Sequence, residues 1–323
     1  MTTAMPPMRR IATNGIELAV HDPGGESALP PIVLCHGFPE IAFSWRHQLA
    51  ALPAAGLRVI APDQRGYGAS DRPAPVEAYD MEALTGDLVG LLDAYGWEKA
   101  VFCGHDWGGF VVWQMGARYP ERTAGVIGLN TPYTKRPPID PIALYRQRFG
   151  DDFYIVSFQT PDAPEARFEA DLDKTFRFFL RKSDLSPAAF EALPPERRTF
   201  PLETALAHYD PATDRNQFLS QAEIDAYVAA FSVSGFRGPI NWYRNFTRNW
   251  ERSAHIADHV AAPSLMIMAE DDLVLPPSAA DGMEKYVPNL TKALVKGSGH
   301  WTQQEQPNAV NRLIIDWMVR TFG

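Results

Sequence analysis

The sequence predicts an α/β fold in which a mostly parallel sheet, flanked by helices, is interrupted by an inserted helical cap. From residue 32 onward, short apolar runs alternate with longer helical periods, which is typical of a parallel sheet covered on both faces. The alternation stops near residue 133 and resumes near residue 255. The chain has 323 residues, 46% of them hydrophobic, and can bury a large core. We therefore expect a discontinuous core, residues 1–132 and 255–323, and a cap, residues 133–254.

The first core segment contains most of the expected strands. A hairpin is expected over residues 11–21, and four compact apolar runs predict strands at residues 31–35, 57–61, 100–103 and 126–129. Gly96 ends a helix whose apolar face is formed by Met81, Leu84, Leu88, Leu91, Leu92 and Tyr95. A second helix is expected over residues 108–119, ending before Pro120.

The cap and the second core segment differ in pattern. Residues 133–250 are rich in aromatic residues, prolines and charges and show no strand pattern, and helices are expected over residues 174–181 and 221–231. The second core segment predicts strands at residues 264–269 and 293–295, and helices at residues 277–287 and 309–322.

Composition excludes several classes of protein. The net charge of −9 and the lack of a basic run argue against nucleic acid as a partner. The first ten residues lack the apolar run of a secretory signal, and no stretch approaches 18 uninterrupted apolar residues. Cys35 and Cys103 end apolar runs and are expected to be small buried strand residues. We expect a cytoplasmic protein without a membrane span, which could form homo-oligomers.

The most informative motif lies at the end of the strand expected at residues 100–103. There, Gly104-His-Asp106-Trp-Gly108 has the spacing of a nucleophile elbow, with aspartate at the position that many hydrolases give to serine. A carboxylate held there can attack an sp³ carbon and form an alkyl ester. Taken alone, the motif fits a tight turn with a capping aspartate equally well.

Two further residues favour catalysis. Asp272 follows one of the last expected strands and His300 follows the other, so the chain order is nucleophile, acid and base. A lone histidine is more often a surface or packing residue, but the three residues at strand ends together favour a catalytic triad. The amides of Phe38 and Trp107 are the expected oxyanion-hole donors, because Phe38 follows the strand at residues 31–35 and Trp107 follows the nucleophile.

Together, His36-Gly-Phe-Pro-Glu40, Gly104-His-Asp-Trp-Gly-Gly109 and Gly299-His-Trp-Thr-Gln303 resemble motifs of the α/β-hydrolase-fold epoxide hydrolases, most closely the hydrolase domain of the soluble epoxide hydrolases. The segment around Tyr243 resembles the part of the cap that bears one ring-opening tyrosine, and the segment around Tyr154 resembles the part that bears the other. Tyr145 is another nearby phenol. The resemblance implies that epoxides and water react to vicinal diols without cofactor or metal. It further implies a pocket lined by His36, Pro39, Trp107 and Trp301, although His36 and His105 are expected to be mainly structural.

Elementary chemistry supports tyrosines as the proton donors. Ring opening produces an alkoxide, so the site needs acids that stay protonated at neutral pH, and phenols with a pKa of about 10 meet that need. A haloalkane or haloacid dehalogenase is the nearest alternative, because it uses the same aspartate nucleophile but needs halide donors such as the indole of Trp107. A non-catalytic small-ligand receptor on the same scaffold is a further alternative, although a receptor needs no triad.

Overall fold

An eight-stranded, mostly parallel sheet forms the centre of the molecule, as predicted. The computed structural model describes residues 4–194 and 197–323, so residues 1–3 of the expected core and 195–196 of the expected cap lie outside the described residues. The strand order is β1-β2-β4-β3-β5-β6-β7-β8, in which β2 pairs antiparallel with both of its neighbours, β1 and β4, and all other pairs are parallel. The strands are β1 (Met8–Thr13), β2 (Ile16–His21), β3 (Ile32–Cys35), β4 (Val59–Pro62), β5 (Ala100–His105), β6 (Thr123–Leu129), β7 (Ser264–Ala269) and β8 (Leu290–Val295).

Hydrophobic cores lie on both faces of the sheet. Side chains alternate along β5, so that Phe102 belongs to one core and Val101 and Cys103 belong to the other. The covering helices are α2 (Met81–Tyr95) and α3 (Trp107–Arg118) in the first core, and α1 (Arg46–Ala54) and α14 (Pro307–Phe322) in the second. Because helices cover both faces, the central strands have continuous apolar sequences instead of alternating ones.

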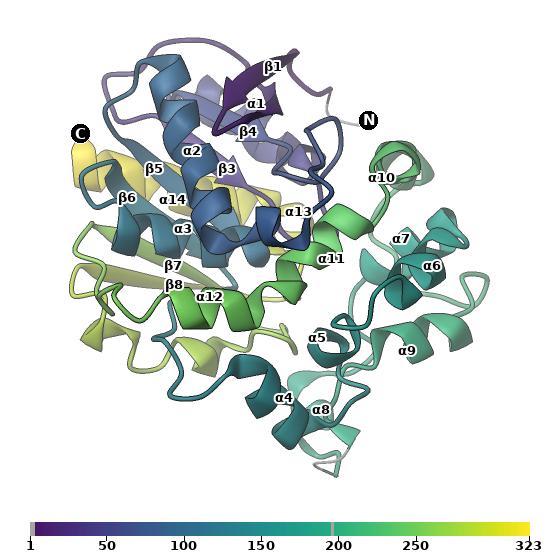
Figure 1. Cartoon of the computed structure of the whole chain (residues 1–323). Coiled ribbons are helices and arrows are strands. Elements are labelled where there is room, and N and C mark those ends of the chain that lie inside the picture. Colours follow the sequence, from purple (N-terminus) through teal and green to yellow (C-terminus); the bar gives the residue numbers. More distant parts are fainter. Residues whose placement is uncertain (1–3, 195–196) are drawn as a thin grey trace.

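The chain between β6 and β7 forms the helical insertion. Figure 1 shows these helices, coloured teal to green, to one side of the sheet, with α11 and α12 next to the core. They are α4 (Pro141–Phe149), α5 (Tyr154–Ser157), α6 (Ala163–Glu169), α7 (Leu172–Phe179), α8 (Pro187–Glu191), α9 (Leu202–His208), α10 (Gln221–Ser234), α11 (Arg237–Arg244) and α12 (Phe246–Arg252). The helices expected from the sequence at residues 174–181 and 221–231 correspond to α7 and α10.

One expected element is wrong. In place of a helix over residues 277–287, the chain forms two short 3-10 turns, η4 (Pro277–Ala280) and η5 (Met283–Lys285). Asp281 is extended and Gly282 has a φ of 74°, so the backbone leaves the helical region between them. The apolar spacing was compatible with a helix, but Gly282 interrupts it. Among the described residues, no helix combines the length and apolar character needed to cross a membrane.

Candidate active site

Three loops at one edge of the sheet bring the expected triad together. Asp106 follows β5 directly, Asp272 lies in the loop after β7, and His300 lies in the loop after β8. These strands are parallel, so their carboxyl ends meet at the same edge of the sheet, which is where open α/β sheets bind ligands.

The turn that carries Asp106 has the strained geometry of a nucleophile elbow. Asp106 has φ 51° and ψ −118°, a conformation that a residue with a Cβ rarely adopts. A Cβ on Gly104 would lie 2.2 Å from the carbonyl oxygen of Gly108, and one on Gly108 would lie 2.1 Å from that of Cys35. Both glycines are therefore required for the close packing of β5, α3 and β3. The Thr131 hydroxyl donates to the carbonyl of Asp106 at 2.8 Å and helps to hold the turn.

His300 lies between the two carboxylates. Its Nδ1 donates to Asp272 Oδ2 at 2.9 Å, and its Nε2 lies 3.7 Å from Asp106 Oδ2. Asp272 is fully buried, and its Oδ1 accepts from the amides of Val274 and Leu275 at 2.9 and 3.0 Å. These contacts fix the imidazole with Nε2 directed toward Asp106.

The charges of the triad shift its pKa values. Burial acts to lower the pKa of His300, but the charge of Asp272 and the contacts with Asp106 outweigh it and raise that pKa well above 6.5. Burial acts to raise the pKa of Asp106, yet His300 and the Phe38 amide hold it below 3.8. Burial likewise opposes ionisation of Asp272, but His300, with further hydrogen bonds, lowers its pKa to about 2. Both carboxylates are therefore ionised at neutral pH.

One expected oxyanion-hole donor contacts Asp106. The amide of Phe38 donates to Asp106 Oδ1 at 2.7 Å. A Cβ on Gly37 would lie 2.4 Å from the Cβ of Asp106, so glycine is what lets this loop approach the carboxylate so closely. Trp107 is the first residue of α3, directly after Asp106.

Two cap tyrosines share a cavity with the triad. Tyr154 begins α5 and Tyr243 lies on α11, with ring centroids 5.7 Å apart at an interplanar angle of 74°. Both line a cavity of about 420 Å³ together with Asp106 and His300. Burial, followed by the charge of Asp106, raises the pKa of both phenols well above 10. The two phenols therefore stay protonated at neutral pH and can donate into the cavity.

Comparison with known proteins identifies the family. Residues 30–307 match the family model described as the alpha/beta hydrolase fold. The chain is 41% identical to epoxide hydrolase A of Mycobacterium tuberculosis, over 97% of both chains. It is 40% identical to bifunctional epoxide hydrolase 2 of Sus scrofa over 90% of its own length, and spans about half (51%) of that longer protein. The crystal structure of epoxide hydrolase A from Mycobacterium thermoresistibile superposes with a TM-score of 0.85 at 41% identity, covering 97% of this chain and 98% of the other.

The chain belongs to the epoxide hydrolases of the α/β-hydrolase fold. The recognition made on the three short motifs and the expected fold class are confirmed by these matches. The mostly parallel sheet with its helical insertion is shared with the solved relatives across nearly the whole chain.

The four expected pocket residues of this hydrolase lie in different surroundings. Trp301 lines the cavity that contains Asp106. Trp107 instead lines a second cavity of about 310 Å³. His36 and Pro39 are buried, and the structure places neither in the described lining of the Asp106 cavity. His36 contacts the carbonyl of Gly37 through Nδ1 and accepts from the amide of Gln64 through Nε2, both at 3.0 Å, so its ring links its own loop to the loop after β4.

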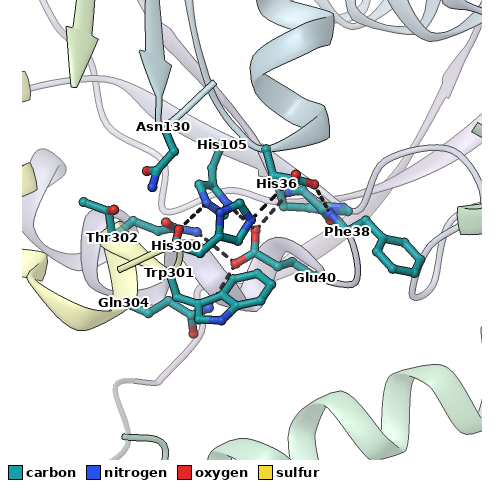
Figure 2. A network of polar contacts seen from close by, with 12 residues as sticks. His36, Phe38, Glu40, His105, Asn130, His300, Trp301, Thr302 and Gln304 are labelled. Atoms are coloured by element: carbon teal, nitrogen blue, oxygen red, sulfur yellow. Dashed lines mark hydrogen bonds and ion pairs between the residues drawn. The ribbon is translucent and has the colours of Figure 1, made fainter. Parts of the chain in front are cut away.

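The sequence analysis missed a buried pair next to the triad, formed by Glu40 and His105. Glu40 Oε2 accepts from the amide of Gly37 at 3.0 Å and contacts His105 Nδ1 at 2.8 Å (Figure 2). His105 Nε2 donates to the carbonyl of His300 at 2.7 Å. Burial opposes ionisation of Glu40, but His105 outweighs it and lowers the pKa of Glu40. Both ring nitrogens of His105 therefore face acceptors, the Glu40 carboxylate and the carbonyl of His300.

Asn130 was also missed, although its position offered a signal. It follows β6 at the same edge of the sheet and donates from Nδ2 to Asp272 Oδ2 at 2.7 Å.

Residues 4–194 and 197–323 contain no group of three or more histidine, cysteine, aspartate or glutamate side chains arranged to hold a metal ion.

Proposed function

We propose that this hydrolase converts epoxides and water to vicinal diols through a covalent alkyl ester on Asp106. The observation that carries the proposal is that one cavity combines an ionised carboxylate with two protonated phenols, Tyr154 and Tyr243. A carboxylate can attack the ring carbon while the phenols donate to the ring oxygen, as epoxide opening requires. The names of the relatives at 40–41% identity support the same reaction.

In the first step, Asp106 Oδ2 is the attacking atom. The Phe38 amide already holds Oδ1 at 2.7 Å, which leaves Oδ2 free to form the bond to the ring carbon. The carbon–oxygen bond of the ring breaks, and the ring oxygen takes a proton from Tyr154 or Tyr243. Oδ1 becomes the carbonyl oxygen of the ester and stays within reach of the Phe38 amide.

In the second step, His300 activates water. Once Asp106 is esterified it no longer carries a charge, so His300 loses two of the interactions that raise its pKa. The imidazolium then gives its proton to the phenolate that the first step leaves, and neutral His300 can act as a base. Water gives a proton to His300 Nε2 and adds to the ester carbonyl carbon. The oxyanion forms on Oδ1, where the amides of Phe38 and Trp107 are the proposed donors. Collapse breaks the bond to Oδ2, the diol oxygen takes the proton from His300, and the new carboxyl group gives its proton back to His300, which restores the imidazolium and the Asp106 carboxylate.

The alternative activity, dehalogenation, needs Trp107 as a halide donor. The Trp107 ring instead packs edge-on against the Tyr243 ring, with centroids 5.1 Å apart. The described lining of the cavity that contains Asp106 includes both phenols and not Trp107, which favours the epoxide reaction over halide release. A non-catalytic receptor would have no use for the ionised triad beside the two phenols.

The test of the proposal is product analysis with labelled water. We expect the wild-type chain to form phenylethane-1,2-diol from styrene oxide and to release no halide from 1-chlorobutane, and folded Asp106→Ala to form no diol. In a single turnover in H₂¹⁸O, the label should enter Asp106 and not the diol, because water attacks the ester carbonyl carbon. Halide release without diol would establish the dehalogenase, and ¹⁸O in the first-turnover diol would exclude the ester.

Three broader expectations belong to the same proposal. The substrate is a small-molecule epoxide and no nucleic acid is bound, in line with a net charge of −9. A cytoplasmic location is supported by two buried cysteines that are both free thiols, Cys35 and Cys103. The proposed boundaries, residues 1–132 and 255–323 for the core and 133–254 for the cap, follow the change from β6 to cap helices and the return to β7.

A further inference from the structure

A chain of polar contacts connects the cap to the core, and it begins at the N-terminus of α10. Glu223 Oε2 accepts from the amide and the hydroxyl of Ser220 at 2.8 and 2.7 Å, which forms a capping box. Its other oxygen, Oε1, accepts from Arg46 Nη2 and Nε at 2.7 and 3.0 Å. Arg46 begins α1 in the core and is 1% exposed. An ion pair between half-buried Glu223 and buried Arg46 therefore joins the first turn of a cap helix to the core.

Gln304 is the next residue in this chain of contacts. Its Oε1 accepts from Arg46 Nη1 at 2.7 Å and from the hydroxyl of Tyr227 at 3.1 Å. Tyr227 lies one turn after Glu223 on α10 and is fully buried. The Nε2 of Gln304 donates to Glu40 Oε1 at 2.9 Å. Only one orientation of the amide satisfies all three neighbours, because Arg46 and Tyr227 need an acceptor and Glu40 needs a donor.

Glu40 links Gln304 to the loop of Phe38 and, through His105, to the loop of His300. Through Oε2 it holds the amide of Gly37, next to Phe38, whose own amide reaches Asp106. Through the same oxygen it holds His105, which donates to the carbonyl of His300 (Figure 2). Glu40 and His105 are fully buried, so water does not easily replace a lost partner. The orientation of the Gln304 amide therefore affects the positions of both the His300 loop and the Phe38 amide.

We propose that Glu223 and Tyr227 of the cap are positioning residues, which set the geometry of His300 and of the Phe38 amide through Arg46, Gln304 and Glu40. The inference rests on the proposed function for the roles of His300 and Phe38. Removing the Tyr227 hydroxyl takes away one donor to Gln304 Oε1, and removing the Glu223 charge weakens the acceptor that holds Arg46, the other donor. The Gln304 amide is then held less firmly against Glu40. A displacement of about 1 Å in reacting groups can cost ~10²-fold in rate, so a small loosening has a measurable effect.

The test uses two conservative substitutions. Tyr227→Phe removes only the hydroxyl, and Glu223→Gln removes the charge while glutamine still suits the capping box. In the double variant we expect the single-turnover rate of ester hydrolysis to fall by roughly 10-fold or more, with KM little changed. The matched control is Asp22→Asn with Tyr95→Phe. It alters an equivalent set of hydrogen bonds at the opposite end of the sheet. There, Asp22 accepts from Arg58 at 2.9 Å and from Tyr95 at 3.1 Å. The control should lose stability and keep its rates.

A second measurement is independent of turnover. In protein with ¹⁵N-labelled histidine, the ring signals of His105 and His300 should shift in the Glu223→Gln, Tyr227→Phe variant and stay in place in the control. A folded double variant with wild-type rates and unchanged ring signals would overturn the coupling. If wild-type protein forms no diol while the ring signals still shift, the proposed function fails and the coupling between cap and histidine loop stands.

Discussion

Removing one phenol should separate the epoxide reaction from any alternative that uses the same nucleophile. Tyr243→Phe keeps a ring that packs edge-on against Phe38, Trp107 and Phe158, with centroids 5.2, 5.1 and 5.0 Å away, so the pocket should keep its shape. Only 3% of Tyr243 is exposed, so water is poorly placed to replace the lost hydroxyl. A preorganised donor to a developing oxyanion is worth ~2.7–4 kcal/mol, which corresponds to roughly 10²- to 10³-fold in rate.

Stopped-flow tryptophan fluorescence can follow ester formation, because Trp107 is adjacent to Asp106 and contacts Tyr243. We expect the alkylation rate of Tyr243→Phe to fall by about 10²-fold or more, with Tyr154→Phe similar and the double variant far slower. Tyr145→Phe is the control, since Tyr145 is a half-buried phenol that lines the second cavity and not the one containing Asp106. Near wild-type alkylation in both single variants would refute the assignment of the proton donors.

Three further predictions concern the triad. His300→Gln should still be alkylated and should accumulate the ester, visible by intact mass spectrometry as a one-substrate adduct; no adduct at saturating substrate would place His300 in the first step. Asp106→Asn should lower the pKa of His300, measured by histidine NMR, because a carboxylate 3.7 Å from Nε2 is lost; an unchanged pKa would mean that Asp106 does not stabilise the imidazolium. Asp272 has its pKa lowered from 3.8 to about 2, so its contribution to the free energy of unfolding is complete above about pH 4 and is lost as the pH falls toward 2. Asp272→Asn should therefore lose less stability over that range in acid denaturation, and an identical loss would contradict the shift.

Much of the fold was predictable because the core elements carry strong local signals. The apolar face that begins at Met81 and the stop at Gly96 predicted α2 with both ends correct, and Gly96 indeed has a φ of 68°. The strand expected at residues 264–269 is β7. Sequence order alone also placed Asp106, Asp272 and His300 at strand ends, and parallel strands turn such positions into neighbours. Local pattern was sufficient wherever neighbouring residues decide the structure.

What escaped prediction depends on contacts between residues far apart in the chain. Glu40 stood within a recognised motif, but its partners His105 and Gln304 lie 65 and 264 positions away. Arg46 and Glu223 are separated by 177 positions, and nothing in the local sequence of either residue indicates the other. His36 was expected to line the pocket from its place in the motif, but the described cavity lining does not include it, and its ring contacts backbone groups of Gly37 and Gln64. Side-chain direction, which local pattern does not report, decided these outcomes.

The two proposed steps make opposite demands on His300, and the charge of Asp106 reconciles them. Before reaction, two carboxylates hold the pKa of His300 high, and the imidazolium in turn keeps Asp106 ionised as the first step needs. Ester formation removes one of these charges, while Asp272, fixed by Asn130 and backbone amides, keeps the ring oriented. His300 then becomes a base only when there is an ester to hydrolyse. The charge of Asp106 therefore keeps His300 protonated before the ester forms, and the loss of that charge lets His300 act as the base in ester hydrolysis.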